Sequence, residues 1–156
     1  MKKLFVSLIA ATLLSACSFF DDEVIQPKLT VKITAQDNIN PNVNGKASPL
    51  ELRIYQLSDD DAFNQASFLQ LYSDDQGALK SGLTAKRHLP SILPGETREE
   101  EFPLVLDSRY IAVLGAFANY REAKSKAIYK IDQFGLVTVN ISVDGLNVSI
   151  SGTEEE

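Results

Sequence analysis

The chain has 156 residues, a formal net charge of −6 and a single cysteine, with 44% hydrophobic and 23% charged residues. The acidic balance argues against nucleic acid or an anionic membrane surface as the main partner. A lone cysteine excludes an internal disulfide and a cysteine-rich metal site.

The first element along the chain is a targeting segment. Lys2 and Lys3 precede an uncharged, mostly apolar run at residues 4–14, which is too short for a permanent transmembrane helix and is typical of a secretory signal. Small residues at positions 15 and 16 lead directly to Cys17, and this arrangement resembles the lipobox of bacterial lipoproteins. The alternative is an ordinary secreted protein with a chance cysteine at the boundary.

The lipobox resemblance implies cleavage before Cys17 and a covalent lipid on its side chain, a diacylglycerol thioether together with an N-acyl chain. Several acyl chains make such an anchor effectively permanent. The next residue is Ser18, and because aspartate at this position favours retention in the inner membrane, the resemblance implies the outer membrane.

Cleavage leaves 140 residues, enough for one domain but not for two, and removal of Lys2 and Lys3 brings the net charge to −8. We predict four segments: a signal peptide at 1–16, a lipidated tether at 17–27, a β-sandwich domain at 28–151 and a solvated acidic tail at 152–156. The ten tether residues 18–27 reach at most ~33 Å, which keeps the domain close to the membrane.

Alternating apolar residues predict strands in the domain. Residues 28–35 alternate with Leu29, Val31, Ile33 and Ala35 on one face, the pattern of a half-buried strand. Residues 50–55 repeat the alternation, with Leu50, Leu52 and Ile54 inward and Glu51, Arg53 and Tyr55 outward. Further strands are predicted at 83–92, 98–106, 109–117 and 127–131.

One helix is predicted between Ser58 and Tyr72, where Ser58 and Asp61 have the spacing of a capping box. At the C-terminus, Asp144-Gly145 predicts a type I′ hairpin that pairs 143 with 146, 141 with 148 and 139 with 150. About eight strands, one helix and no β-α-β alternation indicate an antiparallel β-sandwich.

The residues do not favour catalysis. His88 is the only histidine, so a zinc site has no second nitrogen or thiolate ligand, and no nucleophile-elbow motif is present. We expect His88 to be an ordinary edge or surface residue. Carboxylates cluster at 59–61, 74–75 and 99–101, but they lack the spacing of a calcium loop, so a structural ion is left open. We expect no enzyme, no cofactor and no small-molecule substrate.

The segment Gln36 to Ser48 is the most distinctive feature, since thirteen residues are long for a connection between adjacent strands. Asparagine at 38, 40, 42 and 44 favours turns, and Gly45 permits a positive φ. We expect Ile39 and Val43 to be poorly buried here. The alternative is a loop that packs on its own sandwich.

At this loop the chain resembles the TssJ family, the outer-membrane lipoproteins of type VI secretion systems. The resemblance starts with Asn40-Pro41-Asn42 and Gly45, followed by Ser48-Pro49 and Arg53–Leu57. Further matches in the same order are Phe63, Ala66, Phe68, Leu71 and Tyr72, then Leu93–Glu96, then Tyr110–Phe117. The chain departs from the pattern at Ala118 and Ser125-Lys126, where many members carry arginine and a Trp-Arg pair, so the role of Asn119–Lys126 is left open.

The family resemblance implies a transthyretin-like β-sandwich with a helical insertion and a non-catalytic scaffold role on the periplasmic face of the outer membrane. It implies that the chain binds the periplasmic domain of the inner-membrane protein TssM. The family's binding determinant is the loop between the first two strands, which maps here onto Gln36–Ser48. Within it we predict as partner-binding residues Ile39, Asn40, Pro41, Asn42, Val43, Asn44 and Gly45, with Ile39 and Val43 as apolar anchors. The alternative is a lipid-anchored ligand-binding or chaperone module, which a deep apolar pocket inside the sandwich would favour.

Overall fold

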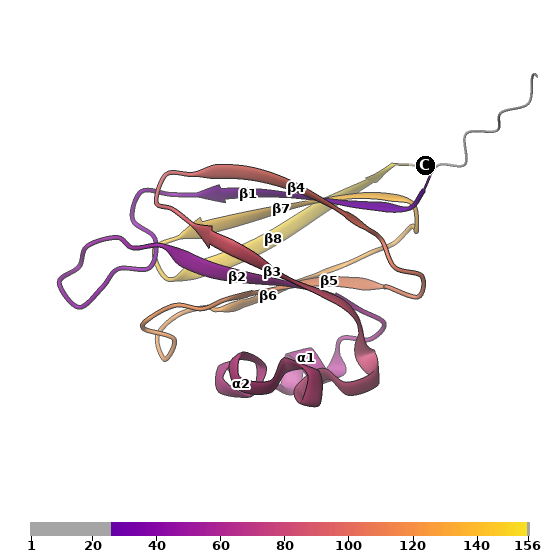
Figure 1. The fold of residues 1–156 in the computed structure, drawn as a ribbon, viewed down its shortest axis with the longest axis horizontal. Coiled ribbons are helices and arrows are strands. Elements are labelled where there is room, and N and C mark those ends of the chain that lie inside the picture. Colours follow the sequence, from indigo (N-terminus) through magenta and orange to yellow (C-terminus); the bar gives the residue numbers. More distant parts are fainter. Residues whose placement is uncertain (1–25, 156) are drawn as a thin grey trace, which may run out of the picture.

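The computed structural model describes residues 26–155, which form two four-stranded sheets packed face to face with helices against one of them (Figure 1). The signal peptide, Cys17 and most of the tether lie outside the described residues. The strands are β1 (Lys28–Ala35), β2 (Leu50–Leu57), β3 (Leu83–Ile92), β4 (Thr97–Pro103), β5 (Tyr110–Gly115), β6 (Lys126–Lys130), β7 (Leu136–Asp144) and β8 (Asn147–Glu155). Between β2 and β3 lie α1 (Asp61–Gln65), α2 (Phe68–Leu79) and a 3-10 turn (Lys80–Gly82).

The strand order is β4-β1-β7-β8 in the first sheet and β3-β2-β5-β6 in the second. This confirms the predicted mainly-β sandwich, but one pairing differs from the antiparallel expectation. β1 lies between β4 and β7 and runs parallel to β7. Parallel neighbours need a long connection, and the whole second sheet together with β4 lies between these two strands in the chain.

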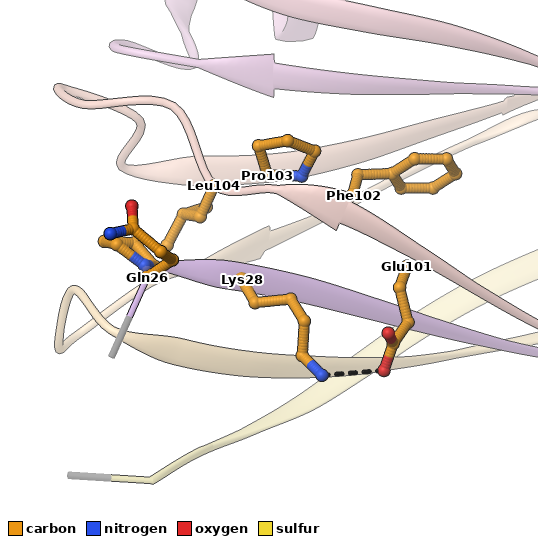
Figure 2. Close-up of a pocket in the computed structure, with 7 residues that line it drawn as sticks. Gln26, Lys28, Glu101, Phe102, Pro103 and Leu104 are labelled. Atoms are coloured by element: carbon orange, nitrogen blue, oxygen red, sulfur yellow. Dashed lines mark hydrogen bonds and ion pairs between the residues drawn. The ribbon is translucent and has the colours of Figure 1, made fainter. Parts of the chain in front are cut away.

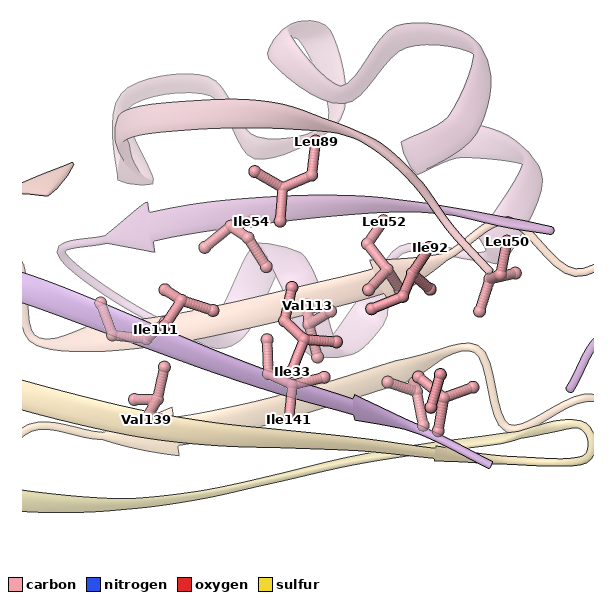
Figure 3. Close-up of a cluster of buried hydrophobic side chains, with 14 of the residues drawn as sticks. Ile33, Leu50, Leu52, Ile54, Leu89, Ile92, Ile111, Val113, Val139 and Ile141 are labelled. Atoms are coloured by element: carbon pink, nitrogen blue, oxygen red, sulfur yellow. The ribbon is translucent and has the colours of Figure 1, made fainter. Parts of the chain in front are cut away.

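The main core lies between the sheets, and the predicted alternation produces it. Leu29, Val31 and Ile33 of β1 are completely buried in this core. Figure 3 shows Ile33 facing residues of β2 and β5, among them Ile54 and Val113. Ile141 of β7 is likewise buried, on the face predicted for it. Burial of this apolar surface is the main favourable contribution to folding.

The helices cover the outer face of the second sheet, and this corrects the expected exposure of β2. Arg53 and Tyr55 do point away from the main core, but they are 9% and 0% exposed because α1 and α2 pack over them. A second cluster forms there from Tyr55, Leu57, Phe63, Ala66, Leu71, Leu79, Ala112 and Leu114. β5 is therefore buried on both faces, which explains its unbroken apolar run.

The helical insertion begins later and extends further than the predicted helix. Asp60 occupies the N-cap of α1 without a side-chain cap bond, so the predicted capping box at Ser58 is wrong. The capping box belongs to α2, where the Ser67 side chain accepts from the Gln70 N–H and the Gln70 side chain accepts from the Ser67 N–H. A Ser-x-x-Gln motif satisfies the free donors of a helix start in the same way as Ser-x-x-Glu.

The last hairpin has the predicted faces but a different register. Val143 pairs with Val148 and Ile141 with Ile150, two residues further along β8 than predicted. The loop is Gly145-Leu146, and only Gly145 has a positive φ (+57°), as in a type II′ turn. A shift of two residues keeps every side chain on its face.

β8 continues to Glu155, so the residues expected to begin a solvated tail at 152 pair with β7 instead.

Candidate functional site

The β1–β2 loop projects from one end of the sandwich (Figure 1). Its tip is a tight turn organised by Asn42, whose Oδ1 accepts from the backbone N–H groups of Asn44 (2.9 Å) and Lys46 (3.1 Å). Backbone bonds from Asn42 N–H to Lys46 O and from Gly45 N–H to Asn42 O close the turn at 2.8 Å each. Gly45 takes a φ of +74°, a conformation that glycine permits. Val43 is fully exposed at this tip.

The base of the loop belongs to the core. Ile39 is 0% exposed and packs in the main cluster, so the expectation that it is poorly buried is wrong. The residue that follows Ile39, Asn40, takes a positive φ of 47°, a conformation that asparagine tolerates better than most residues. The loop thus combines a core residue and an exposed residue four positions apart.

Asn40 ties the loop to neighbouring segments. Its Nδ2 donates to Pro49 O at 2.8 Å, and its Oδ1 accepts from the Ala118 N–H at 2.9 Å. Its backbone N–H donates to Gly145 O at 2.9 Å. The side chain is 6% exposed, so we assign Asn40 a structural role in holding the loop base against the β5–β6 loop and the β7–β8 turn.

The other residues of the predicted site also divide into those that the fold holds at the loop base and those that are exposed at its tip. Asn38 donates to Asp144 Oδ1 at 2.8 Å and accepts from the Gly145 N–H at 3.1 Å, which fastens the first part of the loop to the β7–β8 turn. Pro41 is half-buried, whereas the side chains of Asn42 and Asn44 are exposed. The tip surface available to a partner is therefore residues 42–45, here called the loop tip.

The segment Asn119–Lys126 lies at the same end and has a structural role that the sequence left open. Lys124 donates its N–H to Leu146 O and accepts from the Val148 N–H, which joins the segment to the β7–β8 hairpin. Lys126 Nζ donates to the carbonyls of Phe63, Asn64 and Ala66 at 2.6–3.2 Å. A lysine that satisfies free carbonyls and opposes the negative end of a helix stabilises that end.

A buried ion network under α2 was not found by sequence reasoning. Asp75 is 5% exposed, and its carboxylate accepts from Lys86 Nζ at 2.6 Å and from Tyr55 Oη at 3.3 Å. Arg53 Nη1 and His88 Nε2 lie 3.8 and 3.6 Å from Asp75 Oδ2. His88 is on the edge strand β3, as expected, with about half of its side chain exposed.

The network shifts the pKa values of its buried members. Burial alone would raise the pKa of the Asp75 carboxyl, but the hydrogen bond from Lys86 and the positive charge of that lysine, with smaller contributions from His88 and Tyr55, outweigh it and hold that pKa below its usual value. Burial, and then the negative charge of Asp75, raise the pKa of the Tyr55 hydroxyl. These residues come from α2, β2 and β3, and no sequence spacing links them, so only the packing of α2 on the sheet reveals the cluster.

Within the described part of the chain, no group of three or more histidine, cysteine, aspartate or glutamate side chains is placed to hold a metal ion. No helix among residues 26–155 is long and apolar enough to cross a membrane.

The carboxylates at 99–101 alternate across β4, and Glu99 and Glu101 face Lys32 and Lys28 of β1 at 3.8 and 2.7 Å. Cys17, the predicted lipid attachment point, is outside the described residues.

Solved structures share this fold. The chain is similar to the T6SS lipoprotein TssJ1 from Pseudomonas aeruginosa, with 24% identity, a TM-score of 0.76 and coverage of 84% of this chain and 99% of that one. Serratia marcescens Lip, a membrane bound component of the Type VI Secretion System, gives 18% identity and a TM-score of 0.72, over 85% of this chain and 99% of that one.

A chain in the structure of the T6SS protein TssM C-terminal domain (869-1107) from EAEC gives 20% identity and a TM-score of 0.69, over 80% of this chain and 98% of that one. No curated protein matches the chain in sequence. Residues 27–146 match the family described as Type VI secretion lipoprotein, VasD, EvfM, TssJ. Since that match covers most of the sequence, the chain belongs to the family of type VI secretion lipoproteins.

Proposed function

We propose that the chain is an outer-membrane lipoprotein that binds the periplasmic domain of a TssM-like inner-membrane protein through the loop tip. The observation that carries this proposal is the shape of the β1–β2 loop: a fully exposed valine on a turn held by several hydrogen bonds. An ordered loop loses little conformational entropy on binding, and an exposed apolar side chain ringed by polar groups is typical of an interface anchor.

Family membership and fold support the scaffold role. The family consists of lipoproteins of the secretion apparatus and is not an enzyme family. A chain of similar fold occurs in the structure of the TssM C-terminal domain, and another in a Type VI membrane complex. The buried interior between the sheets is occupied by apolar side chains of both sheets (Figure 3), which favours the scaffold over a ligand-binding module.

The loop-tip assignment can be tested with Val43→Ser in the full-length acylated protein. Binding to the TssM-like periplasmic domain should fall at least tenfold, ~1.4 kcal/mol, because the substitution removes the anchor's apolar contact. A matched control is Leu69→Ser on α2, which also changes an exposed apolar residue (51% exposed) but away from the loop. Unchanged binding by Val43→Ser would refute the assignment.

The proposed lipid anchor on Cys17 is tested separately. Wild-type protein should incorporate labelled fatty acid and sediment with outer membranes, and Cys17→Ser should incorporate none, because this thiol is the only one in the chain. Incorporation into the Cys17→Ser protein would exclude Cys17 as the attachment point. Sedimentation of the acylated protein with inner membranes would contradict the proposed location.

A further inference from the structure

The tether joins the sandwich between two loops at the end opposite to the loop tip. Pro27 O accepts from the Leu104 N–H of the β4–β5 loop at 3.0 Å, and the Lys28 N–H donates to Gly135 O of the β6–β7 loop, also at 3.0 Å. Figure 2 shows Gln26 and Leu104 next to each other at the start of β1. The first described residues of the tether are therefore flanked on both sides by these loops.

Both loops expose large apolar side chains. Leu106 is 72% exposed and Val105 37%, in the β4–β5 loop, and Phe134 is 44% exposed in the β6–β7 loop. β4 was predicted to continue to residue 106 but ends at Pro103, which has no N–H to donate to a ladder, so Val105 and Leu106 lie in the loop. We call Val105, Leu106 and Phe134 the tether face.

A backbone hydrogen bond joins the two loops of the tether face. Ile131 N–H donates to Arg109 O at 2.8 Å, which connects the two loops directly. The charged residues nearest to them in the sequence, Asp107, Arg109, Lys130 and Asp132, sum to zero, whereas Glu154 and Glu155 at the end of β8 pair with Val137 and Leu136 and add negative charge at this end. The apolar side chains, and not the charge of this end, therefore carry the attraction to a membrane surface.

We propose that the tether face rests on the phospholipid surface that holds the acylated Cys17. The inference rests on the proposed function, because it requires the lipid on that cysteine. Ten tether residues bring the joining point to within ~33 Å of the bilayer at all times, and exposed apolar side chains on both sides of that point bind the boundary between headgroups and acyl chains. The sandwich then stands on its end, with the loop tip pointing away from the membrane.

The test measures how deeply each part of the acylated full-length protein lies in vesicles of phosphatidylethanolamine and phosphatidylglycerol. Since the lipid blocks the only natural cysteine, Leu106→Cys and Phe134→Cys each supply a unique thiol for an environment-sensitive fluorophore. Lipids that carry a quencher on their acyl chains report contact. Val43→Cys at the loop tip and Leu69→Cys on α2 are matched controls, since all four positions are exposed.

Quenching at 106 and 134 should be severalfold stronger than at 43 and 69, with the melting temperature unchanged in each variant. Equal quenching at 106, 134 and 43 would overturn the inference, and so would stronger quenching at 69, which would mean that the domain lies on its helices. Absence of fatty acid on Cys17 would instead refute the proposed anchor, and with it the premise of this proposal.

Discussion

Ile39 and Val43 lie four residues apart in the same loop, yet one is completely buried and the other completely exposed. Around Ile39, Asn40 makes hydrogen bonds to Pro49 at the end of the loop and to two other segments of the fold, the β5–β6 loop and the β7–β8 turn. Around Val43, every loop hydrogen bond is local to residues 42–46. The loop therefore has a base that belongs to the folding unit and a tip that the folding unit supports without needing it. Stability and partner binding should separate along this division.

The largest effect is expected at the base. Ile39→Ala should lower the free energy of unfolding by about 2–5 kcal/mol, because it removes buried methyl groups and leaves a cavity in the main core. Chemical denaturation measures this. A loss below ~0.5 kcal/mol would mean that the base is as dispensable as the tip.

Asn40→Ala should be the next most harmful change. It removes the partners of Pro49 O and the Ala118 N–H and places alanine at φ 47°, for an expected loss of about 1–3 kcal/mol. Asn40→Gly is the informative companion in the same denaturation experiment. It loses the same bonds without the backbone strain, so it should be the milder of the two. If both variants match the wild type, the tie between the loop and its neighbours contributes nothing.

Within the tip, Gly45→Ala should destabilise the domain by ~1–2 kcal/mol through its positive φ alone, since nothing lies within 4 Å of an added Cβ. Gly45→Asn should cost less, because asparagine tolerates this region. Thermal melts of the two variants test the backbone explanation. An alanine variant as stable as the asparagine variant would argue against it.

Val43→Ser should have the smallest effect on folding, within ~0.5 kcal/mol of the wild type, as for other surface substitutions. Its side chain is fully exposed and contributes no buried area. A clear drop in melting temperature would show that the tip also belongs to the folding unit. Loss of partner binding in this variant could then no longer be assigned to the tip alone.

The predictions that were correct concern features that depend on local sequence pattern. Period-two alternation identified the core faces of β1 and β7, because this signal acts between near neighbours. Asp144-Gly145 located the last hairpin, but the register, the loop residues and the turn type all differ from the prediction. The length of the loop and its asparagines marked it as distinctive in the sequence.

The predictions that were wrong, and the features that were missed, depend on packing between segments that are distant in the chain. The burial of Arg53 and Tyr55 follows from helices that come after β2 in the chain and fold back over it. Ile39 was misassigned because an apolar residue in a polar loop has no periodicity to show which way it points. The ion network at Asp75 and the cap at Lys126 join elements that no spacing relates.

The position of β1 has a mechanical consequence. β1 begins at the tether and ends at the loop, and it is flanked on both sides, by seven residue pairs with β4 and eight with β7. A pull between the lipid and a partner held at the loop tip would run along this one strand and load both ladders in shear, so that many hydrogen bonds share the tension. An edge strand peeled from its end would break its bonds one at a time. The chain thus places a strand that is hydrogen-bonded on both sides directly between its two proposed points of attachment.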